Sequence, residues 1–525
     1  MDTITLRSRG NNHFPGRQNA HNISDMAIVE AFATALGLVF SWPTIVFVLI
    51  GTAIGMVFGA VPGLGGVIAL ALLIPVTFGM DSTWAMVLFG ATLGGVAFGG
   101  SISAILINVP GTAPNAATLL DGFPMAQQGR ASEALGAAAT ASALGAIFGL
   151  VVFVAVIPVA REIILAFTQP EFFWLAIFGL TVIAVVSRGN LLKGVIAGGF
   201  GLMLAMIGFG NVIGEIRFGF GIRYLYDGID LVVALIGLFA LAEVFRMIAS
   251  GGTIAESGAA VTDRRGVWTG VKQVFRHPRV FFRSSVTGVL VGTVPGAGGA
   301  IATFISYMQA VQASDDPDSF GRGNVEGVIA SEATNDAKDG GTLLPTVVFG
   351  IPGSSTAAVL LGALTMHGLD PGRELLGEEL PMLFVIVIAL LLSNILTSSV
   401  GLLTANHMSK LTRIRVERLV APIIVVCFVG AYALRLNMMD VVVALLFGFI
   451  GYAMIAFDYS RIALVLGLIL GPLAEKSFIL SLRISDSGAM IFFSRPISLI
   501  LIGLTVASLV VPVLKQRRDR AGEET

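Results

Sequence analysis

The chain has 525 residues, of which 55% are hydrophobic and only 12% are charged, and its mean hydropathy is +0.88. A soluble protein carries about 25% charged residues, so this composition excludes a soluble globular domain and predicts an all-α polytopic membrane protein. The net charge is −1 and no basic block is interleaved with aromatic residues, which excludes a nucleic-acid-binding surface.

The N-terminal residues 1–25 are polar and contain Arg7, Arg9 and Arg17. They lack the short apolar core and cleavage site of a signal peptide, so we expect a retained tail. The single cysteine, Cys427, lies among apolar residues. It excludes an internal disulfide and a cysteine-based metal site, and we expect a buried, unreactive thiol.

The first half of the chain alternates apolar segments with Gly/Pro-rich breaks. A short apolar helix is expected at 26–40, and residues 31–80 contain no Asp, Glu, Lys or Arg, although one spanning helix needs only about 20 residues. A span at 43–58 meets the first break at 59–66, and a helix at 84–107 meets the second at 108–115. Apolar stretches follow at 132–157, 170–187, 190–208 and 228–249.

The second half restarts this pattern after a polar, basic stretch at 250–283. An apolar helix from residue 286 meets a break at 292–299 and continues to about 312, and a polar segment at 314–324 follows. At the next break, Pro352 removes a backbone donor and Gly353 relaxes the backbone. We therefore expect one helix to end there and another to begin with Ser354, Ser355 or Thr356 near its N-cap. Further spans are expected at 381–402, 417–434, 438–457, 461–473 and 496–514.

Both halves contain the same two breaks in the same order. Residues 59–66 (Gly-Ala-Val-Pro-Gly-Leu-Gly-Gly) match residues 292–299 (Gly-Thr-Val-Pro-Gly-Ala-Gly-Gly), and Pro-Gly-Thr at 110–112 matches Pro-Gly-Ser at 352–354. Paired Gly/Pro-interrupted segments are typical of secondary transporters, whose sites form where discontinuous helices of two repeats meet. We predict two homologous repeats with about 12 or more membrane segments.

These boundaries predict a tail at 1–25, a transmembrane repeat at 26–249, a basic linker at 250–283, a second transmembrane repeat at 284–514 and a cytoplasmic tail at 515–525. Basic residues after the last span place the C-terminus in the cytoplasm. The basic tail and linker would put the starts of both halves on one side, which favours parallel repeats. Broken helices are commonest in inverted repeats, so we expect inversion and keep the parallel arrangement as the alternative.

The breaks near 110 and 352 supply groups suited to a carboxylate. A carboxylate at lipid depth loses its hydration, and oriented amides at helix N-termini, hydroxyls and side-chain amides replace it. The alternative interpretation is a pair of helix kinks whose hydroxyls satisfy freed carbonyl groups. The predicted substrate-binding residues are Asn108, Gly111, Thr112, Asn115, Gly353, Ser354, Ser355 and Thr356.

The Val-Pro-Gly loops and a group of ionisable residues predict cation binding. Unwound carbonyl groups suit a desolvated Na⁺, although tight helix crossing would also explain these loops. If the carboxylates before the break at 352 lie at membrane depth, they would form a coupling-ion or proton site. If they lie at the interface, they would belong to a solvated helix face. The predicted cation-binding residues are Pro62, Gly63, Gly65, Pro295, Gly296, Gly298, Glu332, Asn335 and Asp336. We expect no cofactor and no metal other than Na⁺.

Several of these motifs together resemble the large membrane subunit of the tripartite tricarboxylate transporters, the TctA-type family, over nearly the whole chain. The resemblance implies a multi-pass protein of the bacterial inner membrane that works with a small four-helix membrane subunit and a periplasmic solute-binding protein. It also implies cation-driven uptake of a carboxylate. Lys338 and Asp339 depart from the family pattern, in which small neutral residues are expected. The motifs are at 61–65, 99–106, 108–111, 121–126, 294–298, 332–336, 350–354, 471–473 and 494–498.

We therefore predict alternating access, with an elevator-like movement expected by fold-level analogy. A passive anion channel is the alternative, although breaks that stop partway suit an occluded site better than a continuous pore. An intramembrane hydrolase would need a histidine beside each seryl cluster, and His367 alone does not supply this. Four further polar positions, Asp121, Arg130, Asp370 and Arg373, are expected to make structural contacts at hairpin bases, and Arg461 to be an interfacial anchor.

Overall fold

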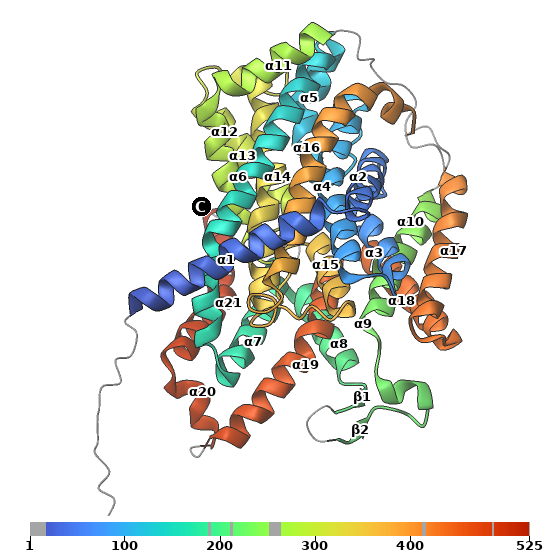
Figure 1. Ribbon diagram of the computed structural model, residues 1–525, viewed down its shortest axis with the longest axis vertical. Coiled ribbons are helices and arrows are strands. Elements are labelled where there is room, and N and C mark those ends of the chain that lie inside the picture. The colour runs from blue at the N-terminus through green and yellow to red at the C-terminus, as the bar shows by residue number, and fades with distance from the viewer. Residues whose placement is uncertain are drawn as a thin grey trace, which may run out of the picture.

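The computed structural model describes residues 17–186, 191–210, 214–250, 264–411, 416–485 and 488–523, and its elements are almost all helices (Figure 1). Within these ranges six helices are long and apolar enough to cross a membrane, or up to eight if two bent pairs each count as one span. The chain is therefore an all-α polytopic membrane protein. The larger number of segments stays a prediction, because the breaks divide apolar sequence into helices of 10–17 residues.

The first half begins with a helix that starts earlier than expected, at Arg17, and continues to Val39. A short antiparallel pair of strands, β1 (Gly208–Phe209) and β2 (Ile216–Arg217), follows the eighth helix. The helices are α1 (Arg17–Val39), α2 (Thr44–Ala60), α3 (Gly65–Thr77), α4 (Ser82–Ile107), α5 (Asn115–Gln127), α6 (Ala131–Ala166), α7 (Gln169–Val186), α8 (Leu191–Ala205), η1 (Arg223–Asp227), α9 (Leu231–Leu235), the π-helical turn η2 (Ile236–Leu241) and α10 (Ala242–Ser250).

In the second half, the described part of the basic stretch expected to be a linker is helical except at His277, which separates two helices. Residues 251–263 lie outside the described ranges. The elements are α11 (Arg264–Arg276), α12 (Pro278–Gly292), α13 (Gly298–Ala313), η3 (Pro317–Ser319), α14 (Val325–Phe349), α15 (Ser355–Met366), α16 (Leu380–Leu411), α17 (Val416–Arg435), α18 (Met438–Ala456), α19 (Arg461–Ile484), η4 (Gly488–Met490), α20 (Ile491–Ser494) and α21 (Pro496–Glu523).

The four predicted helix breaks are confirmed. Helix α14 ends at Phe349, Gly350 takes a left-handed conformation, and α15 begins at Ser355 with Ser354 as its N-cap. The break at 108–115 separates α4 from α5, and the two Val-Pro-Gly loops separate α2 from α3 and α12 from α13. In each of these loops two glycines have a positive φ that other residues rarely adopt: Gly63 and Gly65 in the first, Gly296 and Gly298 in the second.

Helices α4 and α14 lie at the centre, and each packs against two long partners. Helix α4 contacts α2 and α16, and α14 contacts α12 and α6. Glycines permit these approaches, because a Cβ at Gly59 would lie 2.2 Å from the carbonyl oxygen of Val96, and one at Gly292 would lie 2.5 Å from that of Lys338. The order of elements and the close glycine contacts are therefore the same on both sides of the centre.

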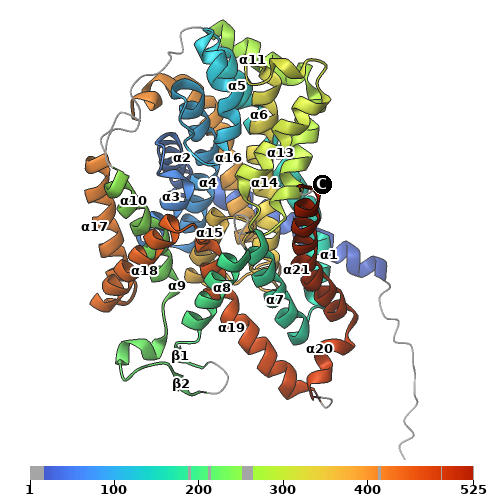
Figure 2. The ribbon, with the colours of Figure 1, turned by 180° about the vertical axis from the view of Figure 1, so that it is seen from behind.

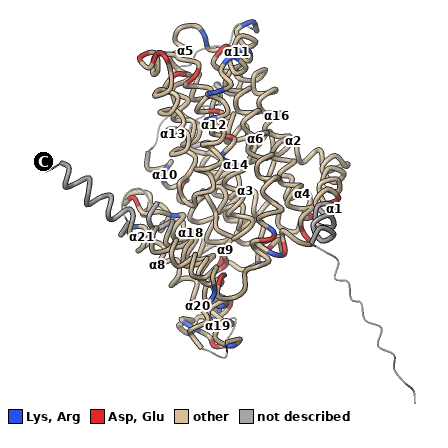
Figure 3. Tube along the Cα trace, turned by 90° about the vertical axis from the view of Figure 1, so that its left-hand side faces the viewer, with Lys and Arg blue, Asp and Glu red and all other residues tan. Residues whose placement is uncertain are grey.

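The periphery surrounds this centre. Helix α1 lies across the bundle against α16, and the pair of strands projects from the lower edge (Figure 1). Helices α10, α17 and α18 form one flank, seen on opposite sides in Figures 1 and 2. Charged residues, coloured along the Cα trace, gather at the two ends of the molecule, around α5 and α11 and around α19 and α20, with a further group on the side of α1 and fewer between them (Figure 3). This distribution suits a protein whose middle lies in lipid.

The turn between α17 and α18 is fixed to η1 by a polar network. Asp440 is fully buried, accepts a hydrogen bond of 2.6 Å from the Tyr224 hydroxyl and pairs with Arg435. Burial, followed by the bond to Asp440, raises the pKa of Tyr224, so its hydroxyl stays a donor at neutral pH. The network thus holds the loop after the strands against the flank of the bundle.

Candidate functional site

All four helix breaks meet at one cavity of about 810 Å³ near the centre of the molecule. Five helices begin at its wall: α3, α5, α13, α15 and α19. The first four follow the breaks, two from each half of the chain. The residues that line the cavity include 63–68, 110–114, 296–301, 354–356 and 458–462, together with Val96, Ala97, Phe239, Glu243, Arg246, Asn335, Lys338 and Asp339.

The helix N-termini direct backbone donors toward this cavity. Within the described part of the chain, no side chain caps the first amides of α3, α5 or α13, although the first two amides of α5 donate to the carbonyl oxygens of Thr112 and Ala113. The first turn of α15 is capped, because the Ser354 hydroxyl accepts the amide of Ala357 at 3.2 Å. Uncapped amides and the positive ends of helix dipoles attract anions. The cavity is therefore suited to a carboxylate.

The breaks of the two halves contact each other across the cavity. A Cβ at Gly66 would lie 3.2 Å from a methyl group of Thr356, and a Cβ at Gly299 would lie 2.7 Å from the ring of Pro114. Thr303 on α13 also donates a hydrogen bond of 3.0 Å to the carbonyl oxygen of Pro114. Each Val-Pro-Gly loop thus packs against the other break of the opposite half.

Fixed cationic side chains lie beside both loops. A Cβ at Gly63 would lie 3.1 Å from a guanidinium nitrogen of Arg246, and the stem of Lys338 lies against Gly299. Both cations have a neighbouring carboxylate: Arg246 pairs with Glu243 on α10, and the Lys338 ammonium lies 2.7 Å from Asp339. An anionic substrate that enters the cavity would meet two cations, one from each side, each with a carboxylate beside it.

A third cation, Arg461, also lines the cavity, where its guanidinium lies 5.3 Å from the centre of the Phe239 ring. The expectation that Arg461 is an interfacial anchor did not include this contact with the cavity, and the depth of Arg461 in the membrane stays a prediction. Sequence reasoning also missed Arg246, since it lies in no motif and reaches the cavity only because α10 packs beside the first loop. Lys338 could be singled out in the sequence as a departure from the family pattern, but the sequence does not show that its side chain lies at the cavity.

The predicted substrate-binding residues divide into a lining and a supporting group. Those that line the cavity are Gly111, Thr112, Ser354, Ser355 and Thr356. Three others lie outside the lining: Asn115 is fully buried behind Thr112, Asn108 is an exposed left-handed residue at the end of α4, and the carbonyl oxygen of Gly353 accepts the amide of Gly296 at 3.2 Å.

The predicted cation-binding residues also divide into those that line the cavity and those that do not. The lining includes Gly63, Gly65, Gly296, Gly298 and Asn335, and it does not include Pro62 or Pro295. Glu332 is 0% and Asp336 1% exposed, so these carboxylates are no solvated face. Glu332 accepts hydrogen bonds from the hydroxyls of Ser101, at 2.7 Å, and Thr118. Asp336 accepts from Ser142, at 2.5 Å, and from the amide of Asn394. The two carboxylates therefore face different neighbours of α14.

Comparison with known proteins identifies the fold family. The model of the tripartite tricarboxylate transporter TctA family matches residues 45–466, which include all four breaks and the cavity. The chain belongs to the tripartite tricarboxylate transporter TctA family. It is 31% identical over 504 residues to an uncharacterized 52.8 kDa protein in the TAR-I ttuC' 3' region of Agrobacterium vitis, covering 95% of this chain and 98% of that protein.

A second A. vitis protein, from the TAR-II ttuC' 3' region, is 29% identical over 236 residues, which are 44% of this chain and 98% of that protein. No solved structure matches the chain. Membership of the TctA family supports a transporter subunit with several membrane-spanning helices.

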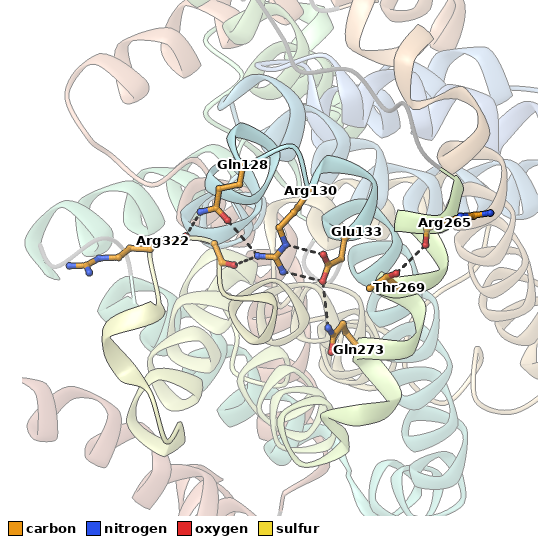
Figure 4. Close-up of polar contacts among 8 residues, drawn as sticks. Gln128, Arg130, Glu133, Arg265, Thr269, Gln273 and Arg322 are labelled. Atoms are coloured by element: carbon orange, nitrogen blue, oxygen red, sulfur yellow. Dashed lines mark hydrogen bonds and ion pairs between the residues drawn. The ribbon is translucent and has the colours of Figure 1, made fainter.

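The polar residues that follow the first break of this TctA-family protein make structural contacts, as expected. Asp121 accepts the hydroxyl of Tyr307 at 2.9 Å and the amides of Gly323 and Asn324. Arg130 pairs with Glu133 at 2.9 Å and donates to the carbonyl oxygen of Gly323 at 3.1 Å (Figure 4). Both residues thus attach the end of α5 to the loop before α14.

After the second break, Arg373 fills a similar role, since it donates to the carbonyl oxygens of Leu165 and Phe167 at the end of α6. The imidazole of His367 lies 3.3 Å from the hydroxyl of Thr77, whereas Ser101 donates to Glu332. This TctA-family protein therefore does not place His367 as the base of either seryl cluster.

Proposed function

We propose that this protein is the large membrane subunit of a binding-protein-dependent secondary transporter that takes up tricarboxylates or related organic carboxylates. One observation carries the proposal: the N-termini of α3, α5, α13 and α15 converge on one cavity that also contains Arg246 and Lys338. Fixed amides and cations at one site replace the hydration that a carboxylate loses at lipid depth.

In this proposal the carboxylates of the substrate compete with Asp339 and Glu243 for the cations that line the cavity. One carboxylate binds Lys338 and the N-terminus of α15, where Ser354, Ser355 and Thr356 line the cavity. Another binds Arg246 and the turn at Gly111 and Thr112. Asn108, Asn115 and Gly353 lie outside the lining and are not among the proposed direct ligands. Because Asp339 and Glu243 stay beside the cations, a substrate with too few negative charges would compete poorly for them.

We further propose that residues 26–249 and 284–514 are homologous repeats in inverted orientation, joined by the linker at 250–283. The shared order of α2 to α6 and α12 to α16, and the matching glycine contacts around α4 and α14, support this proposal. Inversion would place the two cavity faces on opposite sides of a pseudo-two-fold axis. An elevator-like movement of the broken helices against the flanking helices would then alternate access to the two sides of the membrane.

A cation gradient, of Na⁺ or H⁺, would drive uptake. Glu332 and Asp336 are the proposed coupling residues, because a buried carboxylate in a membrane bundle is costly unless it has a function. For the loops, we propose that the carbonyl groups around Pro62, Gly63 and Gly65 and around Pro295, Gly296 and Gly298 are Na⁺ ligands. Each loop lies beside a cation, Arg246 at the first and Lys338 at the second, so neither loop is preferred.

The proposed partners are a small four-helix membrane subunit and a periplasmic solute-binding protein, with the complex in the bacterial inner membrane and the tail at 515–525 in the cytoplasm. The test is counterflow in proteoliposomes that contain the complete complex. Internal unlabelled citrate, or another di- or tricarboxylate from a panel, should drive transient accumulation of the labelled compound. A passive anion channel would let the label equilibrate without such an overshoot, and that result would contradict the proposal.

A further inference from the structure

A chain of hydrogen bonds connects the wall of the cavity with the buried carboxylate of Glu332. Thr112 lines the cavity and donates its hydroxyl to the side-chain oxygen of Asn115. The Asn115 amide nitrogen donates to the Ser101 hydroxyl at 2.9 Å, and Ser101 donates to Glu332 at 2.7 Å. This series of hydrogen bonds thus runs from the start of α5 to α4 and then to α14, and α4 and α14 are the two central helices.

Every donor in this chain points toward Glu332. Thr118, one turn after Asn115 on α5, donates to the second oxygen of the same carboxylate. Hydrogen bonds to a charged acceptor are roughly twice as strong as neutral ones, and a chain of them is mutually reinforcing. The charged carboxylate therefore holds the Thr112 hydrogen inward, and Thr112 presents oxygen lone pairs to the cavity. A substrate carboxylate would be repelled by such an acceptor.

The charges around Glu332 come from a few positions. Helices α4 and α15 contain no ionisable residue. Asp121 on α5 is occupied by Tyr307 of α13 and two backbone amides. On α6, Gly145 packs against Ala333, so its ionisable residues lie at least 12 positions away along the helix, about 18 Å. The other described ionisable groups on these helices are Glu326, Asp336, Lys338 and Asp339 on α14 itself, Arg279 and Arg283 on α12, and Arg265, Lys272 and Arg276 on α11.

A proton fits this site better than a metal ion. Glu332 and Thr118 are 0% exposed, as are Ser101 and Asn115. A cation such as Na⁺ needs several oxygen lone pairs directed at one point, whereas here the hydroxyls of Ser101 and Thr118 direct their hydrogens at the carboxylate. A proton needs no additional room, and it converts a buried charge into a neutral group.

We propose that Glu332 binds the coupling proton and that the chain from Thr112 links this proton to substrate binding. The inference rests on the proposed function and names the ion and its site. One proton from water adds to one Glu332 oxygen, and the resulting O–H donates to Ser101 or Thr118. Ser101 then donates to the carbonyl oxygen of Ala97, which it already approaches at 3.2 Å.

Neutral Glu332 no longer polarises the chain, so Thr112 exchanges one neutral hydrogen bond for a charge-assisted one to the substrate. The linkage is reciprocal: a carboxylate that draws the Thr112 hydrogen into the cavity favours the protonated form of Glu332. Substrate and proton therefore bind together and are released together, which is the requirement for symport. Asn115, which was expected to contact the substrate, acts in this account as the positioning residue between them.

The first test is infrared pH-difference spectroscopy of the purified complex, which needs no substrate. The wild-type protein should show a titrating carbonyl-stretch band of a protonated carboxyl group. Glu332→Gln should lose this band, and the matched control Ser331→Ala should keep it, since Ser331 donates only to the carbonyl oxygen of Gly327 on its own helix. A band that persists unchanged in Glu332→Gln would contradict the proposal.

The second test uses transport by the same variants. Glu332→Gln mimics the protonated side chain, so it should lose uptake driven by a pH gradient, whereas the matched control Ser331→Ala should keep it. Thr112→Val should keep the Glu332 band but lose its increase on addition of a carboxylate that the wild type exchanges. Gradient-driven uptake by Glu332→Gln, or a substrate-induced increase in Thr112→Val equal to that of the wild type, would overturn the linkage. If the wild type itself shows no counterflow, the proposed function fails, and the infrared result still decides whether Glu332 takes up a proton.

Discussion

Replacement of Lys338 by Gln should weaken carboxylate binding strongly. The side chain is 14% exposed, lies against Gly299 in the cavity wall and pairs with Asp339, which is 10% exposed. A hydrogen bond to a charged group contributes about 1.5–3 kcal/mol, which corresponds to about 10- to 150-fold in affinity. In the variant, Asp339 also loses its partner and repels the anion, so we expect the loss to lie in the upper part of this range.

The matched control is the double variant Lys338→Gln with Asp339→Asn. It removes both charges, so it should bind carboxylate more tightly than Lys338→Gln alone and less tightly than the wild type. Affinity is measured as the half-saturating concentration in counterflow, with isothermal titration as a second readout. Wild-type affinity in Lys338→Gln, or a further loss in the double variant, would refute the assignment of Lys338 to substrate binding.

Three further variants probe the cavity and its supports. Arg246→Gln should weaken binding of a dicarboxylate or tricarboxylate by about 10-fold or more, as expected for loss of a charge-assisted bond, with little change for a monocarboxylate in competition assays. Gly111→Ala should lower the thermal midpoint of the complex, because a Cβ there would lie 2.0 Å from the carbonyl oxygen of Gly59. Such overpacking costs about 1–3 kcal/mol or more. The control Gly199→Ala should leave the midpoint unchanged, because a Cβ there would meet nothing within 4 Å. Asp121→Asn should lower the same midpoint without a selective effect on affinity, and a normal midpoint with lost affinity would show that Asp121 is a binding residue instead.

The sequence predicted the helix breaks well because local chemistry determines them. Pro352 removes a donor and Gly353 relaxes the backbone whatever the packing, so the end of α14 could be placed within a few residues. The structure places that end at Phe349, where Gly350 takes a positive φ. The repeated Val-Pro-Gly pattern also predicted that the breaks occur in corresponding positions of the two halves. These features depend on neighbouring residues in the chain, which a single sequence displays directly.

The composition of the site was harder to predict, because it depends on contacts between distant helices. Arg246 reaches the first loop only through the position of α10, and Arg461 reaches the cavity because α19 begins at its wall. The alternative of a solvated face for Glu332 remained open in the sequence, since its spacing to Asp336 suits an exposed helix as well as a buried one. Burial on all sides of α14 by α4, α5, α6, α12 and α13 excludes that alternative.

In the proposed mechanism one cavity binds the carboxylate and opens to each side of the membrane in turn. The most direct measurement is labelling of Ser355→Cys, in a Cys427→Ser background, with an impermeant maleimide added to either side of oriented vesicles that contain the complete complex. Ser355 lines the cavity, and the native thiol of Cys427 is fully buried. We predict labelling from both sides and protection by a transported carboxylate. Labelling from one side only, unaffected by substrate, would contradict the account.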